Sequence, residues 1–248
     1  MKIKKLVTAS FLAAAMLGAG NASATPVALE LALLVDVSGS VDATEYNLQR
    51  SGYVNAFQDA AIQSAIAGLS GGIAVTYIEW SGASQQVVQV GWTQITDAAS
   101  ANSFAALING TSRIFSGSTA PGSAINFAVP LFNPNGFEGV RWVIDVSGDG
   151  AENVGANTLA ARNSALAAGV DTINGLPILG EAGLAAFYQN NIVGGTGGFM
   201  LPAASFADFE NAVKTKIGRE ITVPEPATLA LLGLGLAGLG LMRRRKAV

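Results

Sequence analysis

The segment Asp36-Val-Ser38-Gly-Ser40 places one carboxylate and two hydroxyls on alternate residues. It directly follows the apolar run Leu31-Ala-Leu-Leu-Val35, which is typical of a strand buried on both faces. A loop of extended backbone can aim all three oxygens at one point, and a hard divalent cation prefers such an all-oxygen set of ligands. Ligands of open α/β sheets bind at the carboxyl ends of strands. The segment therefore predicts a cation site at a sheet edge.

Two later loops offer further oxygens for the same edge. Thr119 ends a loop rich in Ser and Thr before a predicted helix, and Asp149 follows the predicted strand 141–146 in Ser147-Gly-Asp-Gly. Together with the first loop they supply two carboxylates and three hydroxyls, enough for a six-coordinate ion completed by water or a ligand. Four other hydroxyls compete for the role of Thr119, namely Thr111, Ser112, Ser116 and Ser118.

A plainer interpretation of the two acidic loops also exists. Asp36 and Asp149 are then the N-caps of the helices that follow them, and the hydroxyls are turn residues. Only one basic side chain, Arg113, lies in the three loops, so it could neutralise one of the two acids but not both. The remaining negative charge favours a metal ion.

Missing residue types exclude several kinds of chemistry. The 248 residues contain no His and no Cys, so imidazole catalysis, thiol catalysis, His- or thiolate-ligated metals and disulfides are impossible. The region between Thr25 and Val223 holds every acidic residue except Glu225, whereas half of the 14 basic residues lie outside it. We therefore expect no nucleic-acid partner.

The order of predicted elements indicates an α/β fold with one core. A helix over 43–68 begins at Asp42 with Glu45 three residues on, and the strands 73–80 and 86–92 are close enough to pair antiparallel. Further helices are expected at 97–108, 124–132, 158–168, 184–190 and 206–221, and further strands at 141–146, 170–179 and 198–201. This alternation predicts a doubly wound, mostly parallel six-stranded sheet with one antiparallel edge strand and helices on both faces.

The three loops resemble the metal-ion-dependent adhesion site (MIDAS) of von Willebrand factor type A domains. The resemblance spans residues 28–221 and is carried by Asp36-Val-Ser38-Gly-Ser40, Gly117-Ser-Thr119 and Ser147-Gly-Asp149-Gly. It implies that Ser38, Ser40 and Thr119 are hydroxyl ligands and that Asp36 and Asp149 act directly or through water. The ion implied is one Mg²⁺, or alternatively Mn²⁺ or Ca²⁺, and the fold implied agrees with the predicted sheet.

Both ends of the chain carry predicted targeting segments. Residues 1–24 have three lysines, an apolar run and Ala22-Ser-Ala24, the layout of a signal peptide cleaved by signal peptidase. Residues 223–248 contain Pro224-Glu-Pro226, a sixteen-residue apolar segment and a basic cluster, and they resemble the PEP-CTERM sorting signal of Gram-negative bacteria. That resemblance implies an exosortase, with a membrane-spanning anchor as the alternative. The type A-like domain is then residues 25–222.

These observations favour a non-enzymatic binding module over two alternatives. The expected function is recognition of an acidic group on a protein or polysaccharide, at the cell surface or outside the cell, with membrane contact only through the uncleaved tail. A metal-dependent hydrolase is the first alternative, although no acid or base beyond the two carboxylates is evident in the site loops. A structural component of an exopolysaccharide or biofilm matrix is the second.

Overall fold

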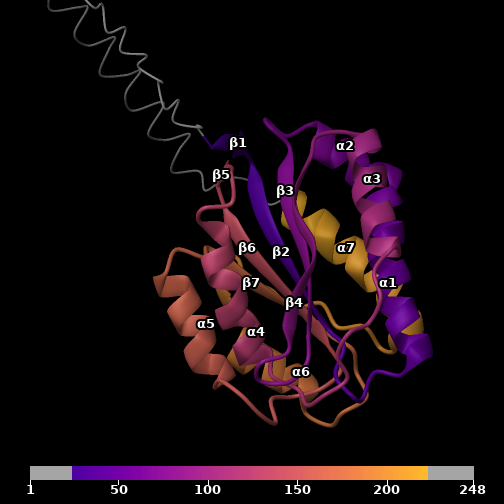
Figure 1. Ribbon diagram of the computed structural model, residues 1–248, viewed down its shortest axis with the longest axis vertical. Coiled ribbons are helices and arrows are strands. Elements are labelled where there is room, and N and C mark those ends of the chain that lie inside the picture. Colours follow the sequence, from indigo (N-terminus) through magenta and orange to yellow (C-terminus); the bar gives the residue numbers. More distant parts are fainter. Residues whose placement is uncertain (1–23, 223–248) are drawn as a thin grey trace, which may run out of the picture.

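A six-stranded, mostly parallel sheet forms the centre of the computed structural model, which describes residues 24–222 (Figure 1). Its strands, in spatial order, are β4 (Gln86–Ile95), β3 (Ile73–Trp80), β2 (Leu29–Asp36), β6 (Trp142–Gly148), β7 (Thr172–Pro177) and β8 (Gly194–Gly195). β4 pairs antiparallel with β3 at one edge, as predicted. The predicted fold class is confirmed, with the addition that the two-residue β8 is also antiparallel to β7.

Helices cover both faces of the sheet. One face carries α1 (Ala43–Gln58), α2 (Ala60–Ala67), α3 (Ala98–Asn109) and α7 (Phe209–Thr222), and the other carries α4 (Pro121–Ala128), α5 (Thr158–Ala167) and α6 (Leu184–Phe187) (Figure 1). Short helical turns follow α4 at Val129–Phe132 and α6 at Tyr188–Ile192, and another precedes α7 at Phe206–Asp208. β1 (Thr25–Val27) and β5 (Phe137–Gly139) form a separate parallel pair.

The central strand β2 is buried along its whole length. Leu31 and Leu33 pack into the core under α1 and α7, whereas Ala32 and Leu34 pack into the core under α4 and α5. This alternation explains the unbroken apolar run, because a strand covered on both faces exposes neither set of side chains to water. After β2 the chain continues to β3, on one side of β2 in the sheet. After β6 it continues to β7, on the opposite side. The carboxyl ends of β2 and β6 therefore flank the topological switch point.

Two predicted elements are wrong in detail. The helix predicted over 43–68 is interrupted at Asp59, whose backbone is extended and whose side chain accepts the Ala61 and Ile62 N–H groups, so that Asp59 caps a second helix. The strand predicted at 198–201 is not a regular strand: its segment meets the end of β7 through two isolated parallel bridges, Met200 with Gly175 and Ala203 with Ile178, and β8 takes the edge position instead. Pro202, which has no N–H, does not end this pairing, because the Ala203 N–H donates to the Pro177 carbonyl at 2.9 Å.

Within the described residues, no helix is both long and apolar enough to cross a membrane. The predicted signal peptide, apart from its last residue Ala24, and the predicted sorting tail lie outside the described part of the chain.

Candidate metal centre

The structure brings the five predicted site residues together at the carboxyl edge of the sheet. Asp36 ends β2, Ser38 and Ser40 follow it, Asp149 follows β6, and Thr119 precedes α4. Three hydrogen bonds join the hydroxyls to Asp149: Thr119 Oγ1 to Ser38 Oγ at 3.3 Å, Ser38 Oγ to Ser40 Oγ at 3.2 Å, and Ser40 Oγ to Asp149 Oδ1 at 2.7 Å. Asp36 Oδ1 accepts the Ser38 N–H at 2.7 Å.

The hydroxyls that compete with Thr119 have other surroundings. Thr111 donates to the Ile108 carbonyl inside its own turn. Ser112, Ser116 and Ser118 are exposed. Of the Ser and Thr side chains between residues 111 and 119, Thr119 is the one that hydrogen-bonds Ser38.

Helix capping does not explain the two aspartates. The N-cap of α1 is Asp42 and the N-cap of α5 is Asn157, so neither Asp36 nor Asp149 caps the helix that follows it. The interpretation of both acids as caps is therefore wrong, although Asp36 does close a local turn by accepting the Ser38 N–H.

Burial makes the negative charge of the two aspartates costly. Asp36 is fully buried, and burial raises its pKa to about 7, with the neighbouring charge of Asp149 acting in the same direction. Burial also raises the pKa of Asp149, and the carboxylates of Glu45 and Glu181 add to that rise. Both acids therefore lie where a cation would stabilise their ionised forms.

Arg113 does not supply that cation. Its guanidinium donates to the carbonyl oxygens of Val37, Ser38, Val41 and Phe115 at 2.6–3.2 Å. All of these acceptors are backbone atoms of the two hydroxyl-bearing loops, so Arg113 holds the loops in shape. The sequence indicates that Arg113 lies near the site but does not predict this role, because hydrogen bonds to backbone carbonyls cannot be inferred from residue types.

Two further side chains position Thr119. The Thr119 N–H donates to Asn153 Oδ1 at 2.9 Å, and the Asn153 N–H returns a hydrogen bond to the Thr119 carbonyl at 3.0 Å. Ser81, directly after β3, accepts the Gly117 N–H through Oγ at 2.7 Å and accepts the Ala120 N–H through its carbonyl at 3.0 Å. The sequence does not predict either role, because Asn153 and Ser81 act through contacts with residues distant in the chain.

Gly148 leaves room for the Asp36 carboxylate. A Cβ at this position would lie 2.6 Å from Asp36 Oδ2 and 2.9 Å from the Tyr188 hydroxyl oxygen. Both oxygens are buried without a hydrogen-bond partner within the described residues. A side chain here would therefore displace Asp36, and the glycine in Ser147-Gly-Asp149 is a packing requirement of the site.

The donor set fits a small divalent cation. Oxygen ligands about 2.1 Å from an octahedral ion lie about 3 Å from one another, and the three hydrogen bonds that link the hydroxyls and Asp149 span 2.7–3.3 Å. Asp36 Oδ2 is buried and has no hydrogen-bond partner in the described part of the chain, so it can still accept. The residues that could hold an ion are the five predicted from the sequence.

A comparison with known protein families identifies the family of this chain. The family model described as "Protein of unknown function (DUF1194)" matches residues 26–225, which is most of the chain. The chain belongs to the DUF1194 family. A second model, the PEP-CTERM protein-sorting motif, matches residues 222–246 of this DUF1194 member and indicates an exported protein that is sorted to the cell surface. No curated protein matches the chain.

Solved structures of von Willebrand factor type A domains share the fold of this DUF1194 member. Proximal thread matrix protein 1 from the mussel byssus, with a zinc-occupied MIDAS motif, is 17% identical over 79% of this chain and 47% of its own, with a TM-score of 0.54. The pilus adhesin SpaC from Lactobacillus rhamnosus GG is 17% identical over 78% of this chain and 31% of its own, with a TM-score of 0.54.

A third similar structure is the PilB minor pilin from Streptococcus sanguinis, which is 13% identical over 80% of this chain and 64% of its own, with a TM-score of 0.55. The chain thus spans less than half of the mussel protein and less than a third of SpaC. At these identities the likeness shows the fold. The named neighbours are a matrix protein, an adhesin and a pilin rather than enzymes.

Proposed function

We propose that this chain is an exported binding module that captures an acidic group of a surface protein or polysaccharide through one divalent cation. Asp36, Ser38, Ser40, Thr119 and Asp149 would hold the ion, which is Mg²⁺ in the first instance. The observation that carries the proposal is the buried Asp36 carboxylate beside Asp149, with one oxygen unpartnered and no basic side chain within the described residues paired to either acid.

The chain's own groups prepare such a site before a ligand arrives. Arg113 fixes the first loop through its carbonyls, and Asn153 fixes the backbone of Thr119. Three of the five ligands are neutral hydroxyls, so a bound ion keeps much of its positive character towards an incoming carboxylate or sulfate. The zinc-occupied MIDAS of the mussel protein supports a divalent cation at this place in the fold.

Hydrolysis is the second candidate, and one observation favours it. Glu181 lies close enough to Asp149 to raise the pKa of that group, and its Oε1 has no hydrogen bond within the described residues. A carboxylate in that position is able to act as a general base toward a metal-bound substrate. Turnover of phosphate or glycoside substrates in Mg²⁺ would support this candidate. A purely structural matrix component would show neither turnover nor metal-dependent binding.

Metal binding is tested by thermal or urea unfolding with and without Mg²⁺. We expect added Mg²⁺ to raise the free energy of unfolding by about 2.7 kcal/mol when its concentration is one hundred times the dissociation constant. Thr119→Ala removes a neutral ligand without leaving a buried charge unpaired, so it should fold but respond less. Ser118→Ala changes an exposed hydroxyl of the same loop and is the matched control.

The same variants separate binding from a structural role. Binding to acidic polymers or peptides should be lost in EDTA and weakened in Thr119→Ala, and should be unchanged in Ser118→Ala. Binding that persists undiminished in EDTA would contradict the proposal, even where the fold and the metal are both confirmed.

We also propose how the chain is processed. Residues 1–24 would be removed by signal peptidase, residues 25–222 would form the binding domain, and residues 223–248 would be the sorting tail read by an exosortase. The secreted chain should then begin at Thr25 and lack the segment after about Pro226. Intact-mass measurement on material from the native host checks both ends, and a full-length carboxyl terminus in the membrane fraction would favour a plain anchor.

A further inference from the structure

An open pocket of about 780 Å³ lies directly beside the candidate metal centre. Ser40, Thr119 and Asp149 line it, so a molecule that occupies the pocket also lies against the centre. The opposite wall is formed by the turn after β7 and by the segment before α7, including Leu179, Gly180 and Phe206. The pocket is therefore positioned to decide which ligands reach a bound ion.

All of the charged residues that line the pocket are acidic. Its lining contains Glu45, Asp149, Glu152 and Glu181 and neither lysine nor arginine. With Asp36 beneath them, these carboxylates leave the region negatively charged even after a divalent cation is added. The metal centre attracts one carboxylate, whereas its surroundings repel a second one.

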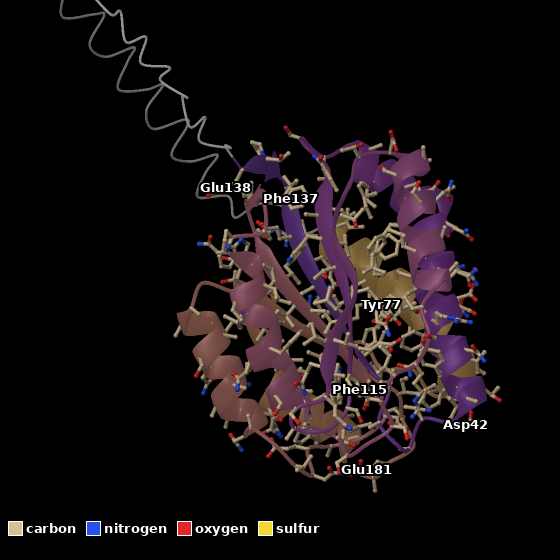
Figure 2. All side chains as sticks on the ribbon, in the orientation of Figure 1. Asp42, Tyr77, Phe115, Phe137, Glu138 and Glu181 are labelled. Carbon is tan, nitrogen blue, oxygen red and sulfur yellow. The ribbon has the colours of Figure 1, made fainter. Side chains whose placement is uncertain are left out.

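Glu45 and Glu181 are held as fixed acceptors on two different elements of the rim. Glu45 Oε2 accepts the Asp42 N–H at 2.8 Å at the start of α1, and Glu181 Oε2 accepts the Ala151 N–H at 2.9 Å. In both residues the second oxygen, Oε1, makes no hydrogen bond within the described residues, and it can accept from a ligand. Figure 2 shows Asp42 and Glu181 at the same end of the molecule.

Apolar side chains occupy the rest of the pocket. Leu48 is 40% exposed and Leu179 is 39% exposed, and both lie in the lining together with the half-buried Phe206. A ligand that covers them removes apolar surface from water, which contributes about 25 cal/mol per Å². The pocket thus combines a carboxylate-binding centre, an apolar wall and an acidic rim.

We infer that the pocket selects a peptide segment that carries a single carboxylate close to an apolar side chain and a cationic side chain, in preference to an acidic polysaccharide. The inference rests on the proposed function for the carboxylate contact and extends it through Glu45, Glu181, Leu48 and Leu179. A polyuronate brings a carboxylate on every sugar, and each one beyond the first meets the acidic rim. A lysine or arginine near the metal-bound carboxylate meets Glu45 or Glu181 as a partner of opposite charge.

The test measures binding of the whole secreted chain to defined probes in Mg²⁺. The first probe is a fluorescent, end-blocked hexapeptide with one aspartate, one leucine and one lysine among glycines. The others replace its lysine by glutamate or its leucine by serine, and polygalacturonate serves as the polysaccharide. We expect the lysine peptide to bind about tenfold more tightly than the glutamate peptide, the size of one modest charge interaction.

The double variant Glu45→Gln with Glu181→Gln should reduce that difference to about twofold, because it removes both rim charges. Glutamine still serves in the capping box at Glu45 and can still accept the Ala151 N–H, so the fold is preserved. Glu138→Gln is the matched control, since Glu138 is exposed and lies at the opposite end of the molecule (Figure 2). It should leave the tenfold preference intact.

The outcomes separate the inference from the proposed function. Metal-dependent binding without a preference for the lysine peptide, or with a preference for polygalacturonate, overturns the inference and leaves the proposed function standing. Absence of metal-dependent binding to every acidic probe overturns the proposed function itself. A lysine preference that disappears in the double variant and persists in Glu138→Gln supports the inference.

Discussion

The domain places acidic side chains close together in two regions, beneath α7 and at the carboxyl edge of β2 and β6. Beneath α7, the buried Lys216 ammonium lies 2.5 Å from Asp145 Oδ1 and 2.7 Å from Glu220 Oε1. Asn174 donates a further hydrogen bond to Glu220 at 2.8 Å. At the sheet edge, Asp36 and Asp149 are joined by hydroxyls and backbone N–H groups, and Arg113 is directed to carbonyls instead.

Burial raises the pKa of Asp145 and of Asp36 to about 7, so desolvation is costly in both regions. The charge of Lys216 counteracts that rise at Asp145, whereas no side-chain cation among residues 24–222 does so at Asp36. The difference shows that the chain supplies its own cation, Lys216, to the buried acids beneath α7. At the edge, the oxygens lie together without such a cation within the described residues, which agrees with the proposed binding of a metal ion there.

Breaking the internally neutralised region should have the largest effect. Lys216→Met leaves Asp145 and Glu220 buried without a cation, and we expect a loss of about 3–5 kcal/mol in the free energy of unfolding, measured in urea. Adding Asp145→Asn should restore part of the loss, because one of the two uncompensated charges is then gone.

Lys214→Met is the control for this prediction. Lys214 pairs with Glu210 at 2.8 Å on the partly exposed face of the same helix, and such a pair contributes about 0–1 kcal/mol. Equal losses in Lys214→Met and Lys216→Met would contradict the importance of the buried ion pairs.

Filling the space beside Asp36 should have an intermediate effect. Gly148→Ala puts a Cβ within 2.6 Å of Asp36 Oδ2, which forces the carboxylate to move and should cost about 1–3 kcal/mol of stability. It should also abolish the stabilisation by Mg²⁺, which calorimetric titration can measure. Gly91→Ala, in β4, meets nothing within 4 Å and should preserve the Mg²⁺ response. A Mg²⁺ response retained in Gly148→Ala would show that Asp36 does not hold the ion.

The smallest effect has the opposite sign. In EDTA at pH 8, Asp36→Asn removes a buried negative charge that lacks a cation while keeping an acceptor for the Ser38 N–H. We expect the free energy of unfolding to rise by about 1 kcal/mol. Asp59→Asn retains a helix cap on the surface and should be neutral. Destabilisation by Asp36→Asn would mean that the edge region is already neutralised by the chain.

Local signals in the sequence were enough for most of the fold. The apolar run before Asp36, the hairpin of β3 and β4 and the capping box of Asp42 with Glu45 are all confirmed, because each depends on neighbours in the chain. The interruption at Asp59 was missed, since apolar residues on both sides continue one helical period. The edge strand was misplaced because pairing beside β7 depends on contacts between distant segments.

In the site, too, local sequence patterns predict some features, whereas others depend on contacts between distant segments. The three loops meet as the topology requires, and the chemistry of their five side chains was readable from residue types. Arg113, Asn153 and Ser81 position those loops through backbone atoms of distant residues. The sequence predicts Glu45 only as a capping residue, and its place on the rim of the pocket follows from the tertiary fold, which brings the start of α1 near Asp149 in the loop after β6.

Both ends of the described chain lie at the edge of the sheet opposite the metal centre. The Thr25 N–H donates to the Gly136 carbonyl, and Arg141, just before β6, donates to the Glu220 carbonyl near the end of α7. The eight residues of β2 separate this edge from Asp36 by about 25 Å at about 3.3 Å per residue. With the proposed ligand at one edge and the proposed sorting tail holding the chain at the other, a pull between them would act along β2 and β6. Their ladder hydrogen bonds would then be loaded together in shear, a geometry that resists mechanical rupture.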